Sequence, residues 1–339
     1  MTTHSPTSSA HSVFTLGSFD GVHAGHQALV REARRLANAA GRPGQIRVLA
    51  QAFDPSPISV LHADAAPARI STYEQRCEWL IAAGADSVIK LEPSRELLTL
   101  SAADFVARKV SRYNPIAWVE GPDFRFGHRR EGDVETLTRL GKQHGFDVKV
   151  VEPVSVTLDD HSIVPARSTI ARWLLSQGRV RDAAHVLTRP HQLFGRVVPG
   201  DRRGRTIGYP TANLSTPCMI PADGVYAGIA ELPDGRRCPA AISIGTKPTF
   251  GNCDRAVEAF LLDRESSGRL WSPLRGLPEY DWTLALDMIS WIRDQVTFDG
   301  LPGLLAQIER DCNLVAELTT PYLNASPIGS PKIPQEAGA

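Results

Sequence analysis

The sequence lacks a surplus of charge of either sign. Its 339 residues include 37 lysines and arginines and 37 aspartates and glutamates, so the formal net charge is zero. A protein whose main role is to coat nucleic acid or an anionic membrane needs a basic surplus, so this balance argues against both partners. Local basic clusters remain, and these could bind a compact anion such as a nucleotide.

Long apolar runs, a secretory signal and paired cysteines are also missing. No run of about 18 apolar residues is present, which argues against a membrane-spanning helix. The first residues are rich in Ser and Thr and carry no signal-peptide pattern. The five cysteines are scattered without a Cys-x-x-Cys pair, which is typical of reduced thiols. These absences predict a cytoplasmic protein and leave its oligomeric state open, with a homo-oligomer among the alternatives.

The length and the apolar patterning predict two domains with short disordered tails. From 13 to 188, short apolar runs alternate with helical patterns, which indicates an α/β domain with a parallel sheet. The expected strands lie at 13–16, 46–53, 87–91, 116–120 and 146–151, and helices are expected over 27–40 and from Ser101 and Asp133. Residues 1–12 are expected to form a tail.

From 189 to 318 the pattern changes to short β-rich runs separated by turn residues. Strands are expected at 192–198, 224–232, 240–244, 256–262 and 282–291, which is typical of a small antiparallel β-barrel. A C-terminal helix should follow, because Leu301, Leu304, Leu305, Ile308, Cys312 and Val315 share one helical face. Residues 319–339 are expected to be a second disordered tail.

The segment 17–26 (G-S-F-D-G-V-H-A-G-H) joins the first strand to the first helix. Glycines let the backbone turn sharply, and the helix N-terminus offers free N–H groups to a phosphate. His23 and His26 can donate to the same phosphates, and a His-x-Gly-His pair in this position is typical of nucleotidyltransferases. The alternative is a tight turn with structural histidines, but the flanking strand and helix favour the functional interpretation.

Two later segments of the first domain support this interpretation. Gly121 to Gly127 (G-P-D-F-R-F-G) follows a strand and would place Asp123 and Arg125 at the carboxyl edge of the sheet. Ser168 is expected to cap the helix that Ser168-Thr169-Ile170-Ala171-Arg172 opens, and Arg172 could reach a triphosphate. Each segment alone is as readily explained by capping or by a solvated arginine.

In the second domain, residues 200–213 (G-D-R-R-G-R-T-I-G-Y-P-T-A-N) combine a glycine-rich turn with three arginines. The N–H groups of such a turn could wrap phosphates. Thr211 and Asn213 lie two apart on an extended chain and offer oxygens to a magnesium ion. The alternative is a basic hairpin loop.

Glu258 interrupts the apolar strand 256–262. A carboxylate in this setting is either an outward-facing strand residue or a general base for a hydroxyl group. The pattern alone does not separate the two.

Taken together, these motifs resemble the prokaryotic bifunctional riboflavin kinase/FAD synthetase family from about Val13 to Leu318. The segments G-x-F-D-G-x-H-x-G-H, D-F-R-F-G and S-T-x-x-R resemble its FMN adenylyltransferase part, a Rossmann-like nucleotidyltransferase domain. The segments G-x-x-x-G-R-x-x-G-Y-P-T-A-N, Asp223 to Tyr226, Ile244 to Gly251 and Val257-Glu258 resemble its flavokinase barrel.

The resemblance implies a bifunctional enzyme that phosphorylates riboflavin to FMN with ATP and Mg²⁺ and then adenylylates FMN to FAD. Adenylyl transfer would rely on His23, His26 and Arg172, with nucleotide contacts from Gly17, Phe19, Asp20, Gly21, Gly25, Asp123, Arg125, Ser168 and Thr169. The kinase would rely on Glu258 as base, Thr211 and Asn213 as magnesium ligands, and Gly200, Gly204, Arg205, Gly208 and Pro210 around the substrates. Its partners would be small molecules only: riboflavin, FMN and ATP.

The chain departs from the family pattern at a few positions. In the adenylyltransferase part these are Ser56, Pro165 and Arg167. In the kinase part they are Leu270-Trp271-Ser272 and an apparent insertion from Pro273 to Glu279. An alternative hypothesis is therefore a riboflavin kinase whose N-terminal domain is catalytically weak or silent. An aminoacyl-tRNA synthetase fragment is disfavoured, because zero net charge and the absence of a K-M-S-K-S-like loop argue against it.

Overall fold

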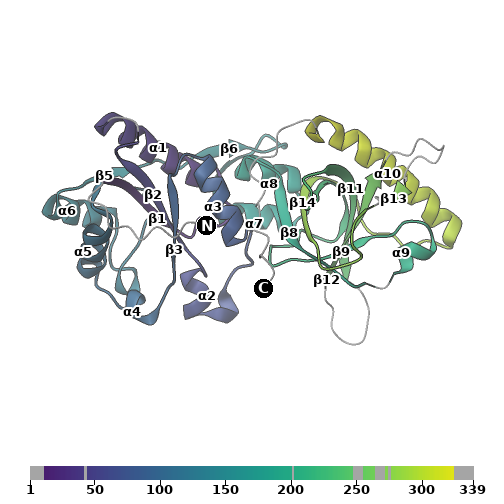
Figure 1. Ribbon diagram of the computed structural model, residues 1–339, viewed down its shortest axis with the longest axis horizontal. Coiled ribbons are helices and arrows are strands. Elements are labelled where there is room, and N and C mark those ends of the chain that lie inside the picture. The colour runs from purple at the N-terminus through teal and green to yellow at the C-terminus, as the bar shows by residue number, and fades with distance from the viewer. Residues whose placement is uncertain are drawn as a thin grey trace. The chain divides into compact units, whose positions relative to one another are not determined.

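The computed structural model describes residues 11–41, 44–200, 202–246, 255–263, 272–273 and 276–323. Within these residues the chain divides into two compact units (Figure 1). The first unit comprises 11–67 and Tyr73–Ser155, and the second comprises Ala68–Thr72 and 156–323. None of the described helices is long and apolar enough to cross a membrane.

The first unit is built on a five-stranded parallel sheet with the order β3-β2-β1-β4-β5. Its strands are β1 (Ser12–Gly17), β2 (Arg47–Phe53), β3 (Ser87–Leu91), β4 (Pro115–Glu120) and β5 (Asp147–Val150). Its helices are α1 (Ala24–Ala40), α2 (Pro57–Leu61), α3 (Tyr73–Ala82), α4 (Arg95–Leu98), α5 (Ala102–Tyr113) and α6 (Val134–His144), with short 3₁₀ turns η1 (Ala63–Ala65) and η2 (His128–Arg130). The predicted parallel-sheet fold is confirmed.

Apolar residues of the strands alternate between two cores, one on each face of the sheet. Val13 and Val48 face α1 and α3, where they pack with Val30, Trp79 and Leu80. The next residues along the same strands, Phe14 and Leu49, belong to the opposite core with α5 and α6. The strands are therefore buried on both faces, and their loops at the carboxyl edge are left for a ligand.

The second unit contains a closed antiparallel barrel. The sheet order is β11-β10-β14-β8-β9-β12-β13, and an additional β11–β12 pairing closes six of these strands into a ring. Its strands are β8 (His191–Val198), β9 (Ala212–Ser215), β10 (Gly224–Glu231), β11 (Arg237–Thr246), β12 (Arg255–Asp263), β13 (Ser272–Pro273) and β14 (Thr283–Arg293). The predicted barrel is confirmed, although β9 was not expected as a strand.

Helices and a small hairpin complete the second unit. The remaining elements are the hairpin β6 (Ser155–Thr157) and β7 (Ile163–Pro165) and the helices α7 (Ser168–Ser176), α8 (Val180–Leu187), α9 (Arg203–Thr206) and α10 (Leu301–Leu323). Helix α10 packs against the barrel through Cys312 and Val315, which contact the cluster of Phe260 and Leu262 (Figure 1). Four cysteines of the described residues (Cys77, Cys218, Cys238 and Cys312) carry free thiols.

Two predicted boundaries differ from the observed structure. The tail predicted to begin at 319 is wrong for 319–323, because α10 continues to Leu323 despite Pro321 inside its last turn. The tail predicted for 1–12 is wrong at Ser12, which already belongs to β1. Helix α8 packs on β8 and β14, and residues 156–188 belong to the same compact unit as the barrel. The domain boundary predicted between residues 188 and 189 stays a prediction.

Candidate functional site

The loop of residues 17–26, here called the histidine loop, leaves β1 at the centre of the first sheet and leads directly into α1. His23 occupies the N-cap position of α1 and accepts a hydrogen bond at Nδ1 from the His26 backbone N–H, at 3.4 Å. A 17-residue helix concentrates unpaired N–H groups and a partial positive charge at this end. The predicted arrangement of a strand, a loop and a helix N-terminus is therefore present, whereas phosphate binding there stays a prediction.

The two imidazole rings of this loop lie against each other. The His23 and His26 centroids are 3.6 Å apart at an interplanar angle of 23°. Phe19 is buried and contacts the His26 ring edge-on at 5.2 Å. Phe19 therefore packs against the His26 ring of the stacked pair, which restricts how the pair can be oriented.

The D-F-R-F-G segment lies at the neighbouring strand end. Strands β1 and β4 are adjacent and parallel, so the loops that leave their carboxyl ends share one edge of the sheet. Asp123 and Arg125 are exposed on this loop, while Phe124 and Phe126 stack at 5.4 Å and anchor it. The structure therefore brings the expected Asp123 loop and the histidine loop to the same edge.

Glu120, which the sequence interpretation missed, lies between these two loops. The pairing of β1 with β4 ends at Phe14 and Trp118. Beyond this pair, Glu120 Oε1 accepts hydrogen bonds from the Leu16 backbone N–H at 2.8 Å and from Trp118 Nε1 at 2.7 Å. The residue is only 2% exposed. Burial raises the pKa of Glu120 well above its usual value, although both hydrogen bonds act in the opposite direction. A charged residue ending an otherwise apolar strand was the available signal.

The S-T-x-x-R segment opens α7, which belongs to the second unit. The expectation that Ser168 caps this helix is wrong: Arg167 occupies the N-cap position, without a side-chain capping bond, and Ser168 is the first helical residue. Thr169 is exposed, and Arg172 Nε donates to the Ala68 carbonyl at 2.7 Å.

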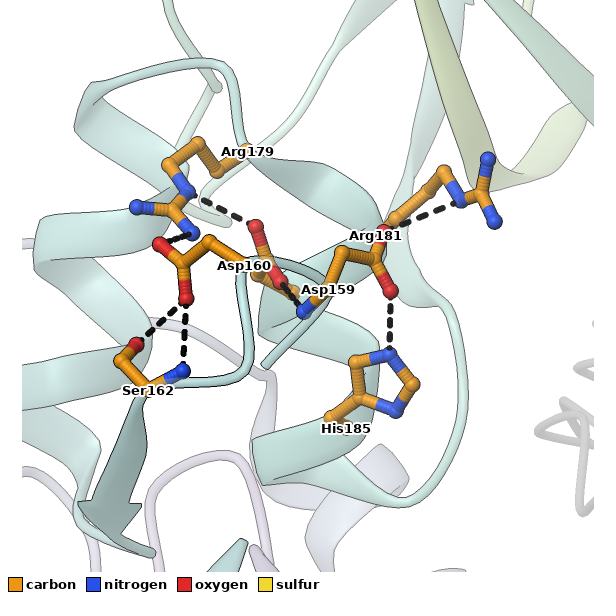
Figure 2. A network of polar contacts seen from close by, with 7 residues as sticks. Asp159, Asp160, Ser162, Arg179, Arg181 and His185 are labelled. Atoms are coloured by element: carbon orange, nitrogen blue, oxygen red, sulfur yellow. Dashed lines mark hydrogen bonds and ion pairs between the residues drawn. The ribbon is translucent and has the colours of Figure 1, made fainter. Parts of the chain in front are cut away.

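A polar network ties the hairpin β6–β7 to α8 (Figure 2). Arg179 donates to Asp182 at 2.7 Å and to Asp160 at 2.6 Å, and Asp182 accepts the Asp159 N–H at 2.7 Å. Asp159, Asp182 and His185 offer metal-ligand atoms within 4.8 Å of one another. Both carboxylates already contact side chains of the network, because Asp182 pairs with Arg179, and Asp159 pairs with Arg181 and contacts His185. The network therefore joins the hairpin to α8.

In the second unit, the residues 200–211 form what we call the arginine loop, between β8 and β9. It includes the single turn α9 and is shaped by close backbone approaches. A Cβ atom on Gly200 would lie 2.1 Å from Asn213 Nδ2, and one on Gly204 would lie 2.2 Å from the Tyr209 carbonyl oxygen. Only glycine fits at position 204, where the neighbour is a backbone oxygen, whereas a side chain at position 200 would require the Asn213 side chain to move. The Asn213 side chain therefore packs directly on the start of this loop.

Two of the residues expected to act in the kinase, Asn213 and Glu258, are neighbours in the barrel wall. Asn213 on β9 pairs directly with Glu258 on β12, and Glu258 pairs on its other side with Ser243 on β11. Directly opposite residues of antiparallel strands project from the same face of the sheet. Glu258 and Asn213 therefore lie side by side, with Thr211 just before the first residue of β9.

An apolar wall borders this pair. Phe260 lies two residues beyond Glu258 on the same face of β12, and its ring contacts Tyr209 edge-on at 5.1 Å. Tyr209 follows Gly208, which has a φ of 86°. The arrangement combines oxygen ligands, a half-buried carboxylate and an aromatic surface, which together suit a flat substrate carrying a hydroxyl group.

The arginines of the loop contact the region of the apparent insertion. Arg205 donates to Glu279 Oε1 at 3.0 Å, and Arg202 lies 3.3 Å from the same oxygen. Arg202 also donates to the Tyr280 hydroxyl at 2.9 Å. The side chains of Arg202, Arg205 and Glu279 are all exposed, and Glu279 pairs with Arg205, which was expected to lie around the kinase substrates.

Some expected residues lie outside the described part of the chain. These are 247–251 of the I-G-T-K-P-T-F-G segment, Leu270 and Trp271 of the substituted L-Y-G segment, and 274–275 of the apparent insertion. Pro165 lies on β7, and Ser56 occupies the N-cap position of α2 without a side-chain capping bond.

Two family models match the sequence. FAD synthetase matches residues 5–164, and riboflavin kinase matches residues 187–319. A protein of Escherichia coli strain K12 named bifunctional riboflavin kinase/FMN adenylyltransferase is 32% identical over 305 residues, which cover 88% of this chain and 90% of that protein. The protein of the same name from Pseudomonas fluorescens is 32% identical over 312 residues, covering 91% and 93%.

A solved structure agrees in fold. The crystal structure of a protein from Streptococcus pneumoniae named macrolide-efflux protein matches with a TM-score of 0.76 and 28% identity. The match covers 91% of this chain and 94% of that chain. The similarity therefore extends over both units.

Proposed function

The chain belongs to the bifunctional riboflavin kinase/FMN adenylyltransferase family, and we propose that its barrel phosphorylates riboflavin while its parallel-sheet domain adenylylates FMN. The family models divide between these two parts of the chain in the same order. The protein is a transferase of phosphorus-containing groups that produces FMN and then FAD. We further propose that both steps occur in the cytoplasm and that the substrates are its only partners.

In the kinase step, Glu258 is the proposed general base. Its carboxylate accepts the proton of the riboflavin 5′-hydroxyl group as that oxygen attacks the γ-phosphorus of ATP and ADP leaves. The half-buried position of Glu258 beside Asn213 supports this role. Tyr209 and Phe260 provide an aromatic surface for the flavin ring, and Arg205 and the N–H groups of the arginine loop would meet the phosphates.

The donor atoms beside Glu258 fit magnesium. Thr211 supplies a hydroxyl oxygen and Asn213 an amide oxygen, and hard divalent cations prefer such oxygen ligands together with substrate phosphates. When bound, Mg²⁺ would neutralise charge on the transferring phosphoryl group. Asn213 would help to position the ion, and Gly200 leaves room for the Asn213 side chain at the start of the loop.

In the adenylyl step, a phosphate oxygen of FMN attacks the α-phosphorus of ATP and pyrophosphate leaves. We propose that His23, His26 and the N-terminus of α1 bind the ATP phosphates and stabilise charge on the departing pyrophosphate. The stacked imidazoles at the start of a long helix support this role. Asp123 and Arg125 at the adjacent strand end, and Ser168, Thr169 and Arg172 on α7, would supply further nucleotide contacts.

The single observation that carries the proposal furthest is the pairing of Glu258 with Asn213 across two strands, because the sequence places them 45 positions apart. The decisive experiment incubates the purified chain with riboflavin, ATP and magnesium and separates FMN and FAD by chromatography. Both products are expected, with FMN appearing first. FMN without FAD, at high enzyme concentration and long incubation, would instead establish a riboflavin kinase that carries a silent nucleotide-binding domain.

A further inference from the structure

The histidine loop has a backbone that ordinary residues avoid. Phe19 and Val22 have φ values of 49° and 37°, and Gly21 between them has 78°. A positive φ is uncommon for any residue other than glycine and is a genuine outlier for a β-branched one. Such a conformation of Phe19 and Val22 persists only where the surrounding structure enforces it. The loop therefore needs contacts that hold it in place.

Part of this support comes from within the loop and from α1. The Val22 N–H donates to the Phe19 carbonyl at 3.0 Å, and Gln27 Nε2 donates to the Val22 carbonyl at 3.0 Å. These bonds close the turn at its helical end. They do not attach its other end, at Ser18, to the rest of the sheet.

Arg76 of α3 makes that attachment. Its Nη1 donates to the Ser18 carbonyl at 2.6 Å and to the Phe53 carbonyl at 2.8 Å, while Nη2 donates to Asp54 Oδ1 at 2.6 Å. The side chain is only 4% exposed. One planar guanidinium thus joins the histidine loop to the carboxyl end of β2. A lysine cannot reproduce this fork, because its donors radiate from a single nitrogen.

The surroundings of Arg76 hold its side chain in place. Asp54 also pairs with Lys90 of β3 through Oδ2 at 2.8 Å, so it lies between two cations. Both cations lie over the Tyr73 ring, Arg76 at 5.6 Å and Lys90 at 5.2 Å from its centroid. The cluster therefore joins α3, β2, β3 and the loop.

We propose that Arg76 is a positioning residue for adenylyl transfer, acting by holding Ser18, and with it the strained loop that carries His23 and His26, against the end of β2. The inference rests on the proposed adenylyl transfer in this domain. The role of Arg76 is to hold the loop in position and not to bind phosphate, because Nη1 and Nη2 already donate to carbonyl and carboxylate oxygens of the protein.

The same domain offers a matched control. Arg34 of α1 donates to the Gly84 carbonyl from Nε at 3.0 Å and from Nη2 at 2.9 Å, and pairs with Asp86 at 2.5 Å. It therefore also joins a carbonyl and an aspartate. Asp86 immediately precedes β3, at the amino ends of the strands and away from the histidine loop. A merely structural effect of losing such a fork should appear equally at Arg34.

The test compares Arg76→Lys and Arg34→Lys in the full chain by steady-state kinetics of both reactions and by thermal melting. Arg76→Lys keeps the charge, so its effect reports the fork alone. We expect kcat/KM for adenylylation of FMN to fall roughly 10- to 100-fold, because small displacements of catalytic groups have effects of this size. The same preparation should phosphorylate riboflavin at the unmutated rate. Arg34→Lys should lower the melting temperature while changing adenylylation less than about twofold.

Three outcomes would overturn the proposal: unmutated adenylylation kinetics in Arg76→Lys, equal losses in the two variants, or a parallel loss of kinase activity. If Arg76→Lys does not fold, Asp54→Asn is measured instead, because it removes the charge that orients Arg76, together with the pairing of Asp54 with Lys90. A loss of adenylylation without a loss of kinase activity is expected there, and unchanged adenylylation refutes the proposal. An unmutated chain that makes no FAD would contradict the proposed function itself and this inference with it.

Discussion

The two loops expected to handle phosphates are held in opposite ways. The histidine loop is strained, contains the buried Phe19 and is attached to the sheet by the buried guanidinium of Arg76. The arginine loop contains one short helical turn, and its Arg202 and Arg205 are exposed and paired with Glu279. Its glycines lie close to Asn213 and to the Tyr209 carbonyl.

For the proposed phosphate sites, this difference indicates two ways of preparing a binding loop. The first loop is preorganised, so little rearrangement would be needed for a nucleotide to bind, and its strain is balanced by the surrounding cluster. The second loop presents its charges to a carboxylate that a phosphate would have to replace. Its fixed part is the strand pair below it, where Glu258 and Asn213 are set by register.

The largest expected effect separates the two chemistries. Glu258→Gln should reduce riboflavin phosphorylation roughly 10²–10⁴-fold, because it removes a general base while keeping the shape of the side chain. Adenylylation of added FMN should stay close to the unmutated rate in the same sample. Chromatography of FMN and FAD measures both, and near-normal kinase rates would remove Glu258 from the mechanism.

The reciprocal change tests the preorganised loop. The double variant His23→Ala/His26→Ala should lower FAD formation from FMN by at least about 10²–10³-fold, because preorganised donors to the departing pyrophosphate are lost. Arg172→Ala should act in the same direction but more weakly. Riboflavin phosphorylation serves as the internal control, and its loss in parallel would show that the variant is misfolded or that the two reactions share this loop.

A smaller effect is expected when a methyl group is added at Gly200, next to the Asn213 side chain. In Gly200→Ala the new methyl group would meet the Asn213 amide at 2.1 Å, so that side chain must move. We expect the magnesium concentration for half-maximal kinase activity to rise about 10-fold, with little change in the melting temperature. Gly303→Ala in α10 is the control, since its Cβ would lie 3.9 Å from Phe298, and equal behaviour of the two variants would contradict a role for Asn213 in metal binding.

The smallest effect concerns the carboxylate on the arginine loop. Exposed ion pairs contribute about 0–1 kcal/mol, so Glu279→Gln should lower the KM of the kinase for ATP by no more than about fivefold. Asp234→Asn, which removes the exposed pair with Arg236 at 2.7 Å, is the matched control and should leave the KM unchanged. A raised KM in Glu279→Gln would mean that this carboxylate helps to place the arginines.

Regular elements could be predicted because their patterns are local. The predicted strand 87–91 coincides with β3, and the residues predicted to start helices, Ser101 and Asp133, are the N-caps of α5 and α6. The strand β9 was missed because four residues with two polar positions carry little periodicity. Its pairing with β12 depends on barrel closure, which no local pattern encodes.

The residues that support the candidate site were harder to predict than those that form it. His23, His26, Asn213 and Glu258 belong to recognisable motifs. Arg76 and Glu120 do not, and each was visible only as a charged residue among apolar neighbours: Arg76 on the helical face of Trp79 and Leu80, and Glu120 two residues after Trp118. Their partners are backbone groups distant in the sequence, so only the folded chain identifies them.

The buried Glu120 has a consequence for how the first unit responds to pH. In the unfolded chain this carboxyl group ionises near its ordinary pKa of 4.5, whereas the folded protein retains the proton to a higher pH. The folded state therefore binds the additional proton, and the stability that Glu120 contributes is full below about pH 4.5 and is lost as the pH rises through the folded-state pKa. In its protonated form, the acid between the ends of β1 and β4 adds no negative charge to the edge of the sheet where a triphosphate is expected to bind.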